Sequence, residues 1–203
     1  MTGSKKSRWG TEEQETLEAI KEVEFCGNVL NMAAGDGRFI DELMRSAAFV
    51  TAVDIDRAEL KKLEEKANDK SKLVTQVVDV TKGLPFEGGC FDGVFCTGTL
   101  HLFNERKLKK VFSEVERVLK PGGKLIFDFA TNIVRLDKEG NVVPYGDDIN
   151  YSTEDALQIL FKGLNNFTVK VEVASFKEDS LDQGKTSYTS ISGNFIIISG
   201  VKE

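Results

Sequence analysis

The sequence is poor in cysteine, in long apolar runs and in basic charge. Its three cysteines, Cys26, Cys90 and Cys96, form no Cys-x-x-Cys pair, and their odd number prevents complete disulfide pairing. This usage favours a reducing, cytoplasmic compartment. No stretch approaches the roughly 18 apolar residues that a membrane-spanning helix needs, and the start of the chain lacks the apolar region of a signal peptide. We therefore expect a cytoplasmic protein that does not cross a membrane.

Basic residues are outnumbered by acidic ones, 27 against 33, so the formal net charge is -6 at pH 7. A negative field repels phosphate backbones and anionic lipid, which disfavours nucleic acid as a partner. The hydrophobic share of 40% and the charged share of 30% are typical of globular proteins. A chain of 203 residues fits one α/β domain with a continuous core, so we predict a single domain.

Short apolar runs alternate with segments of helical periodicity through the first two thirds of the chain. A capping pattern at Thr11 and Gln14 predicts a helix ahead of the first strand. Apolar residues recur at helical spacing around 39–44, 60–67 and 108–119. The runs that predict buried strands are 29–32, 49–53, 73–78, 91–96 and 125–129. Strand and helix in alternation predict a doubly wound α/β fold with a mostly parallel sheet.

The pattern changes after residue 129. Residues 131–151 carry no strong period and weakly indicate a hairpin, while Ser152 and Asp155 predict the cap of another helix. Residues 168–176 and 188–199 predict two final strands that pair antiparallel. The complete prediction is therefore a seven-stranded sheet with a C-terminal antiparallel strand pair.

The first strand runs into a turn of small residues at 33–37. In open α/β sheets such a turn, at the carboxyl end of a strand, is where ligands bind. Gly35 and Gly37 remove side chains, so a ligand can approach the backbone, and the following helix offers free N–H groups. Asp54 ends the second strand seventeen residues after Gly37, close to the spacing at which an acidic side chain accepts hydrogen bonds from a ribose diol. Asp56 is better interpreted as a helix cap. The pattern predicts an adenosine-containing ligand.

Several motifs in this order carry a family resemblance. They are Asn31-Met32-Ala33-Ala34-Gly35-Asp36-Gly37, Val53-Asp54-Ile55, Asp79-Val80 with Leu84-Pro85-Phe86, Phe91-Asp92-Gly93-Val94 and Leu119-Lys120-Pro121-Gly122-Gly123. Over residues 29–129 the chain resembles the class I S-adenosylmethionine-dependent methyltransferases, in particular the branch acting largely on small molecules. The resemblance implies S-adenosyl-L-methionine as cofactor and methyl transfer to an oxygen or nitrogen of a small-molecule acceptor. It indicates neither the acceptor nor the oligomeric state.

The resemblance also implies roles for particular residues. Asp79 would contact the adenine amino group, Val80 and Ile55 would flank the ring, and the backbone of Cys96 would contact the methionine part. The predicted cofactor-binding set is Asn31, Ala33, Gly35, Gly37, Asp54, Ile55, Asp79, Val80 and Cys96. Two members depart from the family pattern. Asn31 stands where the family usually has an acidic residue, and Ala33 replaces the first glycine of the turn.

His101, the only histidine, follows the fourth strand on the carboxyl side of the sheet. We predict that it is a catalytic residue that accepts a proton from the acceptor; the alternative is a structural loop histidine. No metal site is predicted. A dehydrogenase would need a third glycine where Arg38 stands, which disfavours that class. A non-catalytic S-adenosylmethionine-binding relative stays open, because Asn31 lacks the expected charge.

Within the single predicted domain of residues 1–203, three parts are expected. They are an N-terminal arm and helix at 1–27, a cofactor-binding core at 28–130, and a lid, helix and strand pair at 131–203. Residues 131–151 are more apolar than a solvated linker requires and follow the fifth strand at the carboxyl edge. We therefore expect them to cover the crevice, the alternative being a hairpin packed permanently on the domain.

Overall fold

A computed structural model describes residues 14–144, 149–179 and 188–203. Its helices are α1 (Gln14–Val23), α2 (Ile40–Ser46), α3 (Arg57–Lys66), α4 (Glu105–Val118) and α5 (Thr153–Gly163). Its strands are β1 (Asn28–Met32), β2 (Phe49–Asp54), β3 (Leu73–Val77), β4 (Phe91–Cys96), β5 (Leu119–Leu136), β6 (Phe167–Glu178) and β7 (Ser190–Lys202). Thr11 lies outside the described residues, as do residues 180–187 between β6 and β7.

The strands form one seven-stranded sheet in the order β3-β2-β1-β4-β5-β7-β6. The pairs from β3 to β5 are parallel, whereas β7 pairs antiparallel with both β5 and β6. The predicted fold class is therefore confirmed. Between β1 and β4 the strand order reverses, so the loops after these two strands leave toward opposite faces and open a crevice at the carboxyl edge.

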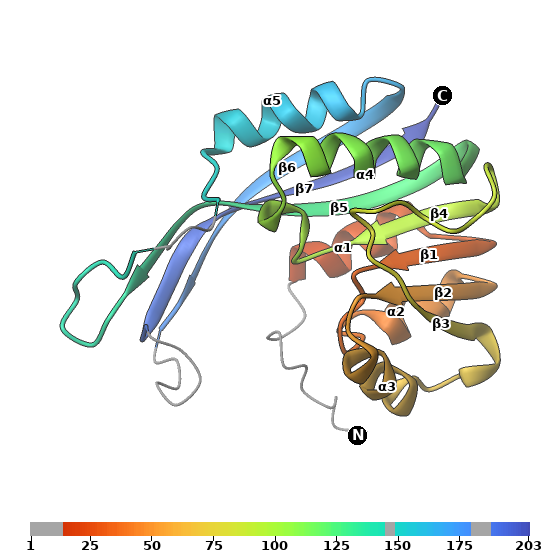
Figure 1. The fold of residues 1–203 in the computed structure, drawn as a ribbon, viewed down its shortest axis with the longest axis horizontal. Helices are drawn as coiled ribbons and strands as arrows, with labels where there is room; N and C mark the ends of the chain where they lie inside the picture. The colour runs from red at the N-terminus through yellow and green to blue at the C-terminus, as the bar shows by residue number, and fades with distance from the viewer. Residues whose placement is uncertain (1–13, 145–148, 180–187) are drawn as a thin grey trace.

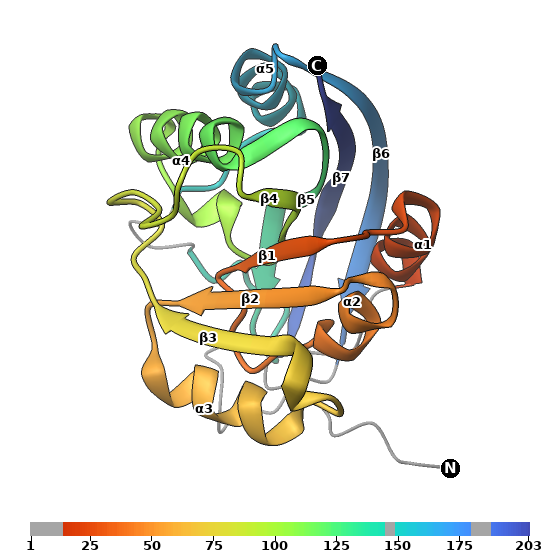
Figure 2. The ribbon, with the colours of Figure 1, turned by 90° about the vertical axis from the view of Figure 1, so that its right-hand side faces the viewer.

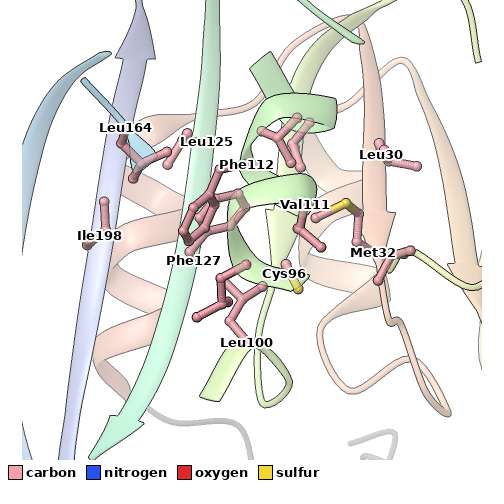
Figure 3. Packing of buried hydrophobic residues seen from close by; sticks show 14 of the residues in the cluster. Leu30, Met32, Cys96, Leu100, Val111, Phe112, Leu125, Phe127, Leu164 and Ile198 are labelled. Carbon is pink, nitrogen blue, oxygen red and sulfur yellow. The ribbon is translucent and has the colours of Figure 1, made fainter. Parts of the chain in front are cut away.

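Helices cover both faces of the sheet (Figure 2). One core lies between the sheet and α4 with α5, and the other lies between the sheet and α1 with α2. In the first core, Phe112 of α4 lies against Phe127 of β5 (Figure 3). The two rings are stacked, with centroids 6.2 Å apart. The side chains alternate along each strand, so neighbouring residues enter different cores. Ile126 accordingly belongs to the second core.

β5 is much longer than the predicted run of 125–129. The residues Lys120-Pro121-Gly122-Gly123, a composition typical of tight turns, lie outside that run. They fall inside β5, where the pairing with β4 shifts register. At its other end β5 pairs with β7 as far as Leu136. The ends of β5 and β6 and the start of β7 therefore project beyond the carboxyl edge of the parallel strands (Figure 1).

The described part of residues 131–151 is anchored to this projection. Beyond Leu136 the chain turns, and Val142 forms a bridge back to Leu136. The Asn150 side chain accepts a hydrogen bond from the Ile133 N–H at 2.9 Å and donates one to the Ile133 carbonyl at 2.8 Å. The Ser152 hydroxyl then caps α5 as predicted. These contacts hold the described residues in a hairpin at the carboxyl edge, and the expectation that they cover the crevice stays a prediction. No helix of the described residues is long and apolar enough to cross a membrane.

Candidate active site

A cavity of about 620 Å³ lies at the carboxyl edge of the sheet. Residues at or just after the ends of β1, β2, β3 and β4 line it, together with residues of β5, β6 and β7. Its size is that of a cofactor or small-molecule site, which typically measures about 300–1,000 Å³. Asn31, Ala33, Gly35, Asp54 and Ile55 of the predicted set line it, as do Asp79, Val80 and His101.

Asp54 connects the first two loops of the site. One of its carboxylate oxygens accepts the Gly35 N–H at 2.9 Å and the other accepts the Asp56 N–H at 2.8 Å. A carboxylate has about four lone-pair positions, so two backbone donors leave it able to accept from a ligand diol. Asp56 accepts the Ala58 N–H at 2.7 Å and caps α3, in agreement with its predicted structural role.

Asp79 lies at the β3 end of the cavity beside apolar side chains. It accepts hydrogen bonds from the Thr81 hydroxyl at 2.6 Å and from the Thr81 N–H at 3.0 Å. The hydroxyl bond is the main reason that the pKa of Asp79 is lowered, so this carboxylate is charged at neutral pH and can accept only. Val80 is buried, while Ile55 is 69% exposed. An acceptor-only carboxylate between two apolar side chains matches the edge and faces of a flat amino-substituted ring.

The turn after β1 holds the two residues that depart from the family pattern. Asn31 is buried and lines the cavity, so its side chain replaces a carboxylate with a neutral amide at this wall. Ala33 adopts a φ of 49°, in the left-handed region that favours glycine. For an L-residue with a Cβ this conformation costs roughly 1–2 kcal/mol. The turn therefore keeps the backbone shape that a glycine would adopt without strain.

Two members of the predicted cofactor-binding set do not line the cavity. Gly37 has a φ of 76°, and a Cβ there would lie 2.7 Å from Cγ of Leu63, so this glycine permits close packing of the turn on α3. Cys96 is fully buried beneath α4, and burial raises the pKa of its thiol. Its neighbours Phe95 and Thr97 line the cavity instead. Gly37 thus has a packing role in this structure, and its predicted contact with the cofactor stays a prediction.

His101 lies in a short 3-10 helix, Leu100–Leu102, between β4 and α4. Its Nδ1 is buried and has no hydrogen-bond partner within the described ranges. Burial, with a smaller contribution from the positive charge of Arg135, lowers the pKa of His101 to about 4. The imidazole is therefore neutral at pH 7 and lines the cavity with the capacity to accept a proton.

The far wall contains residues that sequence reasoning missed. Asp128 of β5 lines the cavity and accepts the Gly98 N–H at 2.6 Å. A charged residue within the apolar run of β5 was the available signal for it. Phe195 of β7 and Phe176 of β6 also line the cavity. Neither had a local signal, because strand register alone brings them to this wall.

The strand order reverses between β1 and β4, and the cavity lies at that point with Asp54 and Asp79 in its lining. These features are typical of α/β proteins that bind a nucleoside cofactor. Residues 30–127 match the methyltransferase domain family. This part of the chain is similar to the class I S-adenosylmethionine-dependent methyltransferases.

Several known methyltransferases resemble this chain in sequence or in fold. Phosphoethanolamine N-methyltransferase 1 of Triticum aestivum is 37% identical over 97 residues, which cover 47% of this chain and 20% of that protein. Demethylmenaquinone methyltransferase of Corynebacterium glutamicum is 35% identical over 107 residues, 52% of this chain and 43% of that protein. A solved DhpI-SAH complex shares the fold with a TM-score of 0.65 at 19% identity, covering 92% of this chain and 81% of the other. The chain thus spans less than half the length of these two curated relatives.

Proposed function

We propose that this protein binds S-adenosyl-L-methionine in the cavity and transfers its methyl group to a small-molecule acceptor. The observation that carries the proposal is Asp54, which lines the cavity, connects the β1 and β2 loops and retains acceptor capacity for a ribose diol. The match of residues 30–127 to the methyltransferase domain family supports it. The acceptors of the two curated relatives differ, so they define no acceptor for this chain.

The proposal assigns a different part of the cofactor to each group of cavity residues. Asp54 accepts the ribose hydroxyls, Asp79 accepts the adenine amino group, and Ile55 with Val80 contact the two ring faces. Ala33, Gly35 and the buried Asn31 border the methionine part at the β1 turn. Backbone at Cys96 is a further proposed contact, although only its neighbours line the cavity in this structure.

The cofactor supplies an activated methyl group, so this chain needs to align the acceptor and exclude water. We assign the acceptor's proton to His101 because its imidazole lines the cavity and is unprotonated at pH 7, although a pKa of about 4 makes it a weak base. Among the described residues, no hydrogen bond to the buried Nδ1 fixes the tautomer of the His101 ring. In the proposal, the bound acceptor therefore determines which ring nitrogen carries the proton. If the chain only binds the cofactor, as the non-catalytic alternative requires, His101 has no such role.

Calorimetry with S-adenosylmethionine and S-adenosylhomocysteine tests the proposal. Both should bind, and Asp54→Ala should weaken both by roughly 1.5–3 kcal/mol through the lost charged hydrogen bond. Asp69→Ala is the matched control: Asp69 also accepts a backbone N–H, from Ser71, but does not line the cavity. Binding of NAD without binding of either compound contradicts the proposal.

A second experiment separates catalysis from binding. Methyl-labelled S-adenosylmethionine is incubated with the protein and a metabolite extract, and mass spectrometry detects labelled products. A labelled product that depends on the protein supports an enzyme, whereas cofactor binding without any labelled product supports the non-catalytic alternative.

We also propose a cytoplasmic location and one domain over residues 1–203. The free thiols of Cys26, Cys90 and Cys96 agree with a reducing compartment.

A further inference from the structure

The far wall of the cavity carries a pair of aromatic rings. Phe176 of β6 and Phe195 of β7 line the cavity with ring centroids 6.3 Å apart and planes tilted by 51°. Phe195 is paired with Ala130 on β5 and with Ala174 on β6. Paired residues point to the same face of a sheet, and both partners are small, so the Phe195 ring has no large side chain beside it in its row.

A glycine in β7 makes room for the second ring. Phe176 is paired with Gly193, and a Cβ at Gly193 would lie 3.1 Å from Cε1 and 3.2 Å from Cζ of that ring. Because Gly193 has no side chain, the Phe176 ring lies across β7 toward Phe195. The strand register thus forms an apolar wall from residues distant from the family-matched part of the chain.

Glu178 continues this wall toward solvent. It follows Phe176 by two residues on β6, so the two side chains project from the same face. Glu178 lines the cavity and is exposed, and no ion pair joins it to another residue in the part of the chain that the structure describes. A carboxylate therefore stands at the end of the aromatic pair.

The described cavity lining is strongly acidic. Among the described residues that line the cavity, Arg38 is the one arginine or lysine, whereas six residues carry carboxylates. The carboxylates are Asp54, Asp56, Glu59, Asp79, Asp128 and Glu178. Together with the net charge of -6, this lining disfavours an acceptor that carries phosphate or carboxylate groups.

The sheet leaves space at this wall beyond the proposed adenosine site. Five strand spacings separate β2, which bears Asp54, from β6, which bears Phe176. At about 4.8 Å per spacing the distance is roughly 24 Å. The proposed cofactor contacts lie at β3, β2 and β1, so β5, β7 and β6 border the acceptor side.

We propose that the acceptor is an apolar molecule bearing a protonated amine, recognised by Glu178 together with Phe176 and Phe195. An ammonium group is attracted both by a carboxylate and by the negative face of an aromatic ring. This inference rests on the proposed function, since it takes the β5–β7–β6 wall as the acceptor side. It concerns recognition of the amine, whichever atom receives the methyl group.

Three probes of one skeleton test the charge preference: 2-phenylethylamine, 2-phenylethanol and 3-phenylpropionate. Each is titrated by calorimetry or NMR into the protein, with and without saturating S-adenosylhomocysteine. The amine should bind about tenfold more tightly than the alcohol, with the carboxylate weakest. Glu178→Gln should remove the preference for the amine. The control Glu172→Gln removes the same charge from the same face of β6, outside the cavity lining, and should retain it.

Phe176→Leu separates ring electrostatics from apolar contact. It should weaken binding of the amine more than binding of the alcohol, because leucine retains apolar area without a ring face. Equal affinity for the three probes, or an amine preference that survives Glu178→Gln, overturns the inference. A protein that shows the amine preference but binds no S-adenosylhomocysteine contradicts the proposed function alone. Normal S-adenosylhomocysteine binding without the preference contradicts only this inference.

Discussion

His101 is the only histidine of the chain, so its titration can be detected in the pH dependence of folding stability. Its pKa in the folded protein is about 4, lowered by burial and by the charge of Arg135, whereas an unfolded chain has a histidine pKa of about 6.5. Between these two values the unfolded state binds the proton and the folded state does not. The neutral imidazole therefore favours folding at pH 7, and this advantage is lost as the pH falls toward 4.

The size of the effect follows from the two pKa values. Between pH 7 and pH 5 the free energy of unfolding should fall by about 2 kcal/mol from this group alone. The midpoint of thermal unfolding should fall by roughly 4–8 °C for a domain of this size. Glu114, whose pKa is lowered to about 2 by its hydrogen bond with Arg117, stays charged in the folded protein over this range. Its contribution falls mainly below pH 4.5.

Urea unfolding at pH 7, 6 and 5 measures the effect in the wild type and in His101→Gln. The variant keeps a polar side chain but cannot titrate. The fall in its free energy of unfolding between pH 7 and pH 5 should therefore be about 2 kcal/mol smaller than in the wild type. Carboxylates that titrate partly in this range contribute equally to both proteins, so their effect cancels in the difference between the wild type and the variant. Equal pH dependence in the two proteins, or an NMR titration midpoint of His101 near 6.5, would refute the reasoning.

Three further predictions concern the turn after β1 and the proposed catalytic residue. Ala33→Gly should stabilise the fold by several tenths to about 1 kcal/mol in urea unfolding, because it removes the left-handed strain, while Ala34→Gly should destabilise it. Gly37→Ala should cost about 1–3 kcal/mol in the same assay, since its Cβ would clash with Leu63; an unchanged midpoint would contradict the packing role. His101→Ala should leave cofactor affinity within about threefold but lower turnover by about 100-fold, and an unaffected rate would make it structural.

The parallel part of the sheet could be predicted because its signals are local. Each buried strand is a short apolar run, and each intervening helix shows its own period. β5 was underestimated because Pro121 and Gly122 are typical of turns, whereas here they occupy an irregular part of a strand. Its extension to Leu136 had no strong period. Pairing with β7, which is distant in sequence, determines that extension.

The same distinction applies to the site. Asp54 and Asp79 follow strands directly, so their place at the carboxyl edge could be predicted from the neighbouring residues. Gly37 shows the limit, because a ligand and a packed helix both require a glycine, and the sequence gives no sign of the contact with Leu63. Phe176 could not be predicted as a cavity residue. Its position depends on the register of three strands, which no local pattern specifies.

The position of β7 has a consequence for how the chain folds during synthesis. β6 has no partner in the sheet except β7, which is made after it and must pair with β5 and β6 at once. The strands from β1 to β5 can pair as they leave the ribosome, because domains assemble from their earlier parts first. The aromatic wall can form only when β7 has been synthesised. Until then the apolar face and the unpaired edges of β6 are exposed, which favours pairing with another polypeptide.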